Sequence, residues 1–127
     1  MDVLHELADG MYTGEIKDIT IKDTSNGYPK VTWLLRIIGG ANDGECIEKA
    51  FYLKSRGAMD FLKKELKLIG FEIEDGKELK ALKQKIIGTK IKFTAQTNEQ
   101  GYLVLYAKGI MEDVVKKARS EEKPEYW

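Results

Sequence analysis

The spacing of the apolar residues changes twice along the chain, and this change limits the folds that the sequence can adopt. Up to about residue 54 the pattern is typical of β-strands. Between about residues 55 and 88 apolar side chains recur every three or four residues, as in helices, and after residue 90 polar and apolar residues alternate. A chain of 127 residues has the size of one domain, and we find no internal repeat or linker. We therefore expect one mainly β domain with a helical insertion.

Five segments have the composition of strands, with many Ile, Val, Thr, Tyr and Phe residues and turn residues between them. Gly14 lies inside the first segment and is a candidate for a bulge or a bend. The Asn26-Gly27 pair, close to Pro29, predicts a turn between the first two segments. The five predicted strands cover residues 11–22, 30–38, 46–53, 90–96 and 102–107.

Three helices are expected from the remaining pattern. Ser55 is suited to cap the first helix, which ends near Gly70. A shorter helix carries Leu79, Leu82 and Ile86 and ends at Gly88. A last short helix covers residues 111–118, so that residues 1–118 form the domain, with an N-terminal extension, and residues 119–127 form a polar tail.

The order of these elements favours one architecture. Three strands, a helical segment and two further strands, mostly antiparallel, are typical of the five-stranded OB-fold barrel. We therefore predict an OB-fold-like barrel with the helical segment between strands 3 and 4. An open five-stranded α+β sheet and a small β-sandwich are the alternatives.

The composition argues against several classes of enzyme and of membrane protein. One cysteine, Cys46, and one histidine, His5, are too few for a zinc cluster built from these residues, and no phosphate-binding loop or nucleophile elbow is present. We therefore expect neither catalysis nor a metal or other cofactor. No segment has the features of a signal peptide or a membrane span, so we expect a cytoplasmic protein without a membrane partner.

The formal net charge is zero, which argues against coating nucleic acid by bulk charge alone, but aromatic and basic residues recur where an OB-fold binds its ligands. These places are the outer faces of the second and third strands and the two loops beside them. Trp33 shares the apolar face of the second strand and is a candidate for the core as well as for base stacking. The candidate nucleic-acid-binding residues are Tyr28, Lys30, Trp33, Arg36, Tyr52, Lys54, Arg56, Lys90, Lys92 and Tyr102.

The C-terminal tail combines acidic and aromatic residues, ending in Glu125, Tyr126 and Trp127. A basic, apolar pocket on a partner protein is suited to capture such a peptide. Packing of the same aromatic residues on the barrel or on a second copy of the chain is an equal alternative, and a homodimer is compatible with it.

Short glycine-containing and apolar motifs are distributed over most of the chain, from residue 10 to residue 107. They are the segments 10–16, 26–27, 35–40, 42–44, 51–53, 68–70 and 87–88. In these motifs the sequence resembles a phage and prophage family of single-stranded DNA-binding proteins. The resemblance implies an OB-fold protein that coats single-stranded DNA during phage replication or recombination, without sequence preference, in the bacterial host cell.

The family's proteins often carry an acidic C-terminal tail that recruits replication or recombination proteins. The tail of this chain differs, because it is short, contains Lys123 and has no run of aspartates. The leading hypothesis is non-catalytic binding of single-stranded DNA. A protein-interaction module of a replication or recombination complex is the second hypothesis, and a metal-dependent nuclease is the third.

Overall fold

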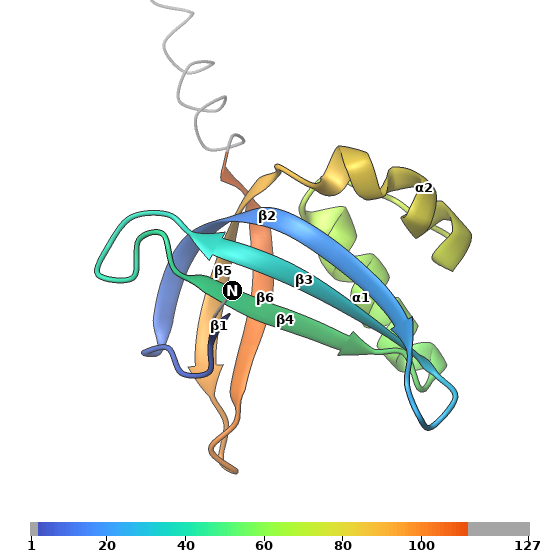
Figure 1. The fold of residues 1–127 in the computed structure, drawn as a ribbon, viewed down its shortest axis with the longest axis horizontal. Helices are drawn as coiled ribbons and strands as arrows, with labels where there is room; N and C mark the ends of the chain where they lie inside the picture. The colour runs from blue at the N-terminus through green and yellow to red at the C-terminus, as the bar shows by residue number, and fades with distance from the viewer. Residues whose placement is uncertain (1–2, 112–127) are drawn as a thin grey trace, which may run out of the picture.

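The fold is a curled β-sheet with two helices on one side, seen here in a computed structural model that describes residues 3–111 (Figure 1). All the helices and strands of this range follow in chain order. They are β1 (Val3–Leu4), β2 (Gly10–Asp23), β3 (Pro29–Ile37), β4 (Cys46–Tyr52), α1 (Arg56–Leu68), α2 (Gly76–Ile86), β5 (Lys90–Thr97) and β6 (Leu103–Ile110).

The six strands form one sheet in the order β1-β4-β3-β2-β5-β6. All neighbours are antiparallel except β1 and β4, and the sheet curls into a half-barrel (Figure 1). The prediction of a mainly β chain with helices is confirmed. The predicted number of strands is wrong, because β1 has two residues and is too short to show any alternation. With β1 counted, the helical segment lies between the fourth and fifth strands. The predicted helix at 111–118 and the tail at 119–127 lie almost wholly outside the described residues.

The curl of the sheet depends on β2, which is 14 residues long and pairs with different strands along its length. Its first part pairs with β5 and its second part with β3. The register on β3 shifts between Ile16 and Asp18, so the irregularity lies at Lys17 and not at Gly14. Gly14 has another role: a Cβ atom there would lie 3.0 Å from Phe93 Cε1 and 3.2 Å from the Arg36 carbonyl oxygen. Only glycine lets the bent strand approach this closely.

The core lies on the inner face of the sheet, under α1. Alternate residues of β3 point inward as the sequence predicts, since Trp33 and Leu35 are both fully buried. The Trp33 ring packs on Phe51, with 4.9 Å between the centroids. Trp33 is therefore a core residue, and its ring has no exposed face on which a base could stack. Ser55 caps α1 by accepting a hydrogen bond from the Ala58 amide at 3.1 Å.

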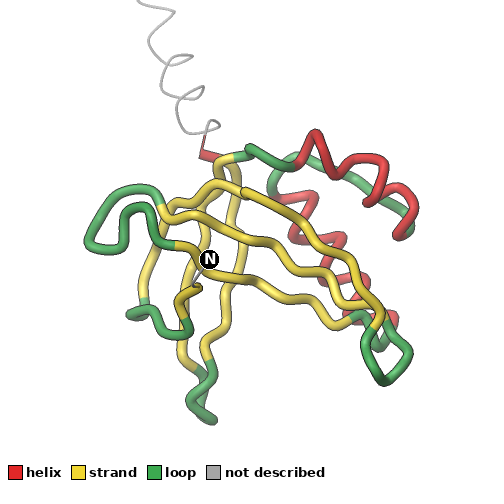
Figure 2. The backbone as a smooth tube through the Cα atoms, in the orientation of Figure 1, coloured by secondary structure: helices red, strands yellow, loops and turns green. Residues whose placement is uncertain are grey.

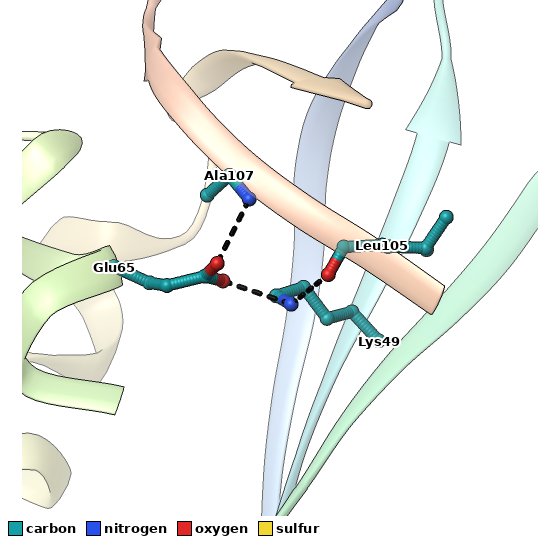
Figure 3. A network of polar contacts seen from close by, with 4 residues as sticks. All are labelled: Lys49, Glu65, Leu105 and Ala107. Carbon is teal, nitrogen blue, oxygen red and sulfur yellow. Dashed lines mark hydrogen bonds and ion pairs between the residues drawn. The ribbon is translucent and has the colours of Figure 1, made fainter. Parts of the chain in front are cut away.

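Two charged side chains are buried in this core, which the sequence pattern did not lead us to expect. Lys49 on β4 is 5% exposed and Glu65 on α1 is 2% exposed. Their Nζ and Oε1 atoms lie 2.8 Å apart. Lys49 also donates a hydrogen bond to the Leu105 carbonyl oxygen, and Glu65 Oε2 accepts one from the Ala107 amide at 3.1 Å (Figure 3).

This network joins β4, α1 and β6 across the open side of the half-barrel, which we call the seam. The Leu105 and Ala107 groups belong to the free edge of β6, so the two side chains provide hydrogen bonds that a neighbouring strand would otherwise supply. Burial lowers the pKa of Lys49 and raises the pKa of Glu65, and the charge of each partner opposes these shifts.

Candidate functional site

Aromatic and basic side chains meet on the outer face of the sheet, where β3 begins and β4 ends. The antiparallel register places Lys30 opposite Tyr52 on β4 and opposite Lys22 on β2. The Nζ atom of Lys30 lies 5.1 Å from the centroid of the Tyr52 ring. Tyr52 is 48% exposed, so much of its ring surface is open to a ligand. This row combines a stacking surface with two cations.

A groove of about 440 Å³ opens beside this row, between the end of β4 and the start of α1. We call it the tyrosine groove, and it is lined by Tyr28, Ala50, Phe51, Tyr52, Lys54, Ala58 and Phe61. Three predicted binding residues, Tyr28, Tyr52 and Lys54, thus line one groove although they come from a turn, a strand and a linker. Arg56, which is exposed, begins α1 two residues after Lys54.

The turn between β2 and β3 holds Tyr28 at the groove. Both the amide and the hydroxyl of Thr24 donate hydrogen bonds to the Tyr28 carbonyl oxygen, each at 2.9 Å. The Gly27 amide donates to the Thr24 carbonyl oxygen at 3.0 Å, with a φ of +86° at Gly27. Glycine adopts this φ readily, and the predicted Asn26-Gly27 turn is confirmed.

The opposite end of β3 has a different electrostatic character. Arg36 is six residues from Lys30, roughly 20 Å along an extended strand. The register places Arg36 opposite Glu15 on β2, and Glu15 opposite Lys90 on β5. One carboxylate therefore lies in the same row as two predicted phosphate-binding residues, and Lys17 Nζ is 3.5 Å from the same Glu15. Of the described residues that line the tyrosine groove, in contrast, none is acidic.

A second hollow, of about 480 Å³, surrounds Arg36. We call it the Arg36 hollow, and it is lined by Val3, Leu4, Lys17, Arg36, Gly44, Glu45 and Cys46. Figure 2 shows that the β2–β3 turn and the β3–β4 loop lie at opposite ends of β3, so the Arg36 hollow is separate from the tyrosine groove.

The other predicted residues are dispersed. Lys92 lies opposite Thr13 on β2, in a hollow beside the β3–β4 loop. Tyr102 is 69% exposed in the β5–β6 turn, where its amide donates a hydrogen bond to Asn98 Oδ1 at 2.9 Å. The structure therefore brings Tyr28, Lys30, Tyr52 and Lys54 together, and it places Arg36, Lys90, Lys92 and Tyr102 elsewhere.

Sequence reasoning missed three side chains near the groove. Phe61 lines the groove from α1 and is 38% exposed. Tyr106 and Lys108 lie on the outer face of β6, next to the buried Leu105 and Ala107. Strict alternation along the last strand was the signal that would have found Tyr106 and Lys108.

Two further searches concern metals and membranes. Within residues 3–111, no group of three or more His, Cys, Asp or Glu side chains is arranged to hold a metal ion. In the same range, neither helix has the length and apolar character needed to cross a membrane.

Comparison of the sequence with models of known protein families finds no match, and no curated protein matches it at a significant level. The resemblance to phage single-stranded DNA-binding proteins therefore remains a prediction.

Proposed function

We propose that this chain binds single-stranded DNA without catalysis and without sequence preference, and that the tyrosine groove is the centre of the binding site. The observation that supports this proposal is the row of Lys22, Lys30 and Tyr52 beside a groove that also contains Tyr28 and Lys54. Aromatic faces next to cations are what a single strand requires, because its bases stack and its phosphates carry charge.

The topology supports an OB-fold as the scaffold. Strands β2 to β6 have the order β4-β3-β2-β5-β6, and the helices lie between β4 and β5. In this assignment β3 and β4 correspond to the second and third strands of an OB-fold, whose outer face binds oligonucleotides. The tyrosine groove lies at one end of that face.

The energetics predict moderate affinity with limited dependence on salt. Each stacked base contributes roughly 1–3 kcal/mol, and the groove offers two tyrosine rings. Lys22, Lys30 and Lys54 are three cations near it, which predicts a slope of log K against log salt of roughly −2 on a single strand. The zero net charge of the chain is consistent with such a small number of phosphate contacts.

Fluorescence anisotropy of a labelled oligo-dT tests the proposal. We expect saturable binding at low salt, weaker binding at high salt and similar affinity for mixed sequences of the same length. Absence of any anisotropy change at low salt would overturn the proposal. Degradation of the labelled DNA only when a divalent cation is added would favour the nuclease hypothesis instead.

We further propose a role in phage or prophage DNA replication or recombination, in the cytoplasm of the bacterial host. In this proposal Glu125, Tyr126 and Trp127, which lie outside the described residues, bind a replication or recombination protein. A pull-down from host lysate with the full chain and with a chain ending at residue 118 tests this role. Recovery of the same proteins with both chains would contradict it. Light scattering of the full chain tests for a homodimer.

A further inference from the structure

A second pair of an aromatic ring and a lysine lies on β6, on the other side of the seam. The Nζ atom of Lys108 is 5.7 Å from the centroid of the Tyr106 ring. The register between β5 and β6 shifts at this point, because Lys92 faces Gly109 while Phe93 faces Ala107. Lys108 is therefore the extra residue of a bulge, a feature that commonly redirects a side chain. Lys108 is exposed, and its charge is free to reach a phosphate.

Phe61 connects this pair with the tyrosine groove. Its ring lines the groove and also meets the Tyr106 ring edge to face, with 6.2 Å between the centroids. The rings of Tyr52, Phe61 and Tyr106 thus belong to β4, α1 and β6 in turn. Exposed aromatic surface therefore continues from the groove across the seam to Lys108.

The buried ion pair holds these rings in place. Lys49 Nζ lies 5.4 Å from the Phe61 centroid and 5.8 Å from the Tyr106 centroid. Because Lys49 and Glu65 also bind the backbone of β6, α1 and β6 are fixed relative to β4. Ordered rings lose little conformational entropy when a base stacks on them.

We propose that the bound strand continues from the tyrosine groove over Phe61 to a second subsite, in which Tyr106 stacks a base and Lys108 binds a phosphate. This inference rests on the proposed function and extends it, since Phe61, Tyr106 and Lys108 are not among the residues expected to bind DNA. A ligand confined to the groove does not reach the second subsite, whereas a longer strand does. The effect of the subsite therefore depends on oligonucleotide length.

The test compares oligo-dT of 4 and of 16 nucleotides, which span the usual site sizes of about 4–16 nucleotides per OB-fold. Lys108→Glu changes an exposed side chain and leaves the core intact. Lys80→Glu, on the exposed face of α2, makes the same change of charge away from the seam and is the matched control. We expect Lys108→Glu to weaken binding of the long oligonucleotide roughly tenfold relative to Lys80→Glu, with little effect on the short one.

Tyr106→Leu provides a second measurement, because it removes the ring and retains apolar bulk beside Phe61. We expect roughly tenfold weaker binding of the long oligonucleotide, from the loss of one stacked base, and normal affinity in Tyr106→Phe. Thermal unfolding of each variant establishes that it is folded.

The outcomes separate the two proposals. If the unchanged chain binds DNA and neither Lys108→Glu nor Tyr106→Leu differs from the control on the long oligonucleotide, the second subsite is wrong and the groove stands. Equal losses on both oligonucleotides would also contradict an extension that depends on length. If the unchanged chain binds no single-stranded DNA, the proposed function itself fails.

Discussion

Lys49 and Lys30 are found on the two faces of the same pair of strands, and each lies beside aromatic rings. On the inner face, Lys49 Nζ is 4.6 Å from the Phe51 centroid and forms a buried ion pair with Glu65. On the outer face, Lys30 Nζ is 5.1 Å from the Tyr52 centroid, and no described carboxylate oxygen lies within 4.0 Å of it. The same residue types therefore stabilise the fold where a carboxylate completes the group, and they remain available to an anionic ligand where none does.

The largest effect is expected from breaking the inner pair. Lys49→Met leaves the Glu65 carboxylate buried without its cation, which costs about 3–5 kcal/mol. Urea unfolding at pH 7 measures this loss. Replacing both residues, as in Lys49→Met with Glu65→Leu, removes the buried charge altogether and should restore most of the stability. A double variant as unstable as the single one would show that the hydrogen bonds to β6, rather than the charges, dominate.

A smaller effect, because it is only part of that loss, is expected from lowering the pH of the Lys49→Met variant. The pKa of Glu65 is already raised by burial from the ordinary value of 4.5, and loss of the Lys49 charge raises it further. A raised folded-state pKa contributes stability below the unfolded pKa, and this contribution is lost as the pH rises through the folded pKa. The stability deficit of Lys49→Met relative to the unchanged chain should therefore shrink between pH 7 and pH 4. A deficit independent of pH would contradict this assignment.

On the outer face, Tyr52→Ala should weaken binding of oligo-dT by about 1–3 kcal/mol, since one stacking surface is lost. Tyr52 is 48% exposed, so the melting temperature should change little. Tyr52→Phe retains the ring and is the matched control in the anisotropy titration. Loss of affinity in both variants would point to the hydroxyl group rather than to stacking.

A weaker effect is expected for Lys30→Gln, which removes one phosphate contact and leaves the fold unchanged. Affinity at low salt should fall several-fold, and the magnitude of the slope of log K against log salt should fall by about 0.7. A titration across several salt concentrations measures both quantities. An unchanged slope would mean that Lys30 serves only to hold the Tyr52 ring.

The smallest effect is expected for Arg36→Ala. Arg36 was a predicted phosphate-binding residue, but Glu15 lies in the same row between it and Lys90. We therefore expect a smaller loss of oligo-dT affinity than for Lys30→Gln, and a uniform one across sequences. A larger loss would place the centre of the binding site at the Arg36 hollow instead of the tyrosine groove.

Much of the local structure was predictable because it depends on short-range patterns. Alternation assigned Val31 and Leu35 to the core, and Ser55 was identified as a helix cap from its own type and position. Lys49 was missed for the opposite reason. Alternation also turns it inward, but its charge argued against burial until Glu65, sixteen residues away on α1, was seen beside it.

The candidate site was predictable in part. The choice of Tyr28, Tyr52 and Lys54 depended on the expected loop and strand positions, and these three side chains do line one groove. Arg36 and Lys92 were selected by the same rule, but the bend of β2 and the long axis of β3 separate them from the groove. A rule that assigns faces cannot measure distance along a strand.

The sequence by itself determined which residues alternate, where the helices begin and which side chains face outward, because these properties depend on neighbours within a few positions. Only the tertiary structure decided that Lys49 and Glu65 link β4, α1 and β6 across the seam, and that Phe61 meets Tyr106 there. These contacts join segments 16 to 56 residues apart in the sequence. Their formation depends on how strongly the sheet curls, which is a property of the packed domain as a whole.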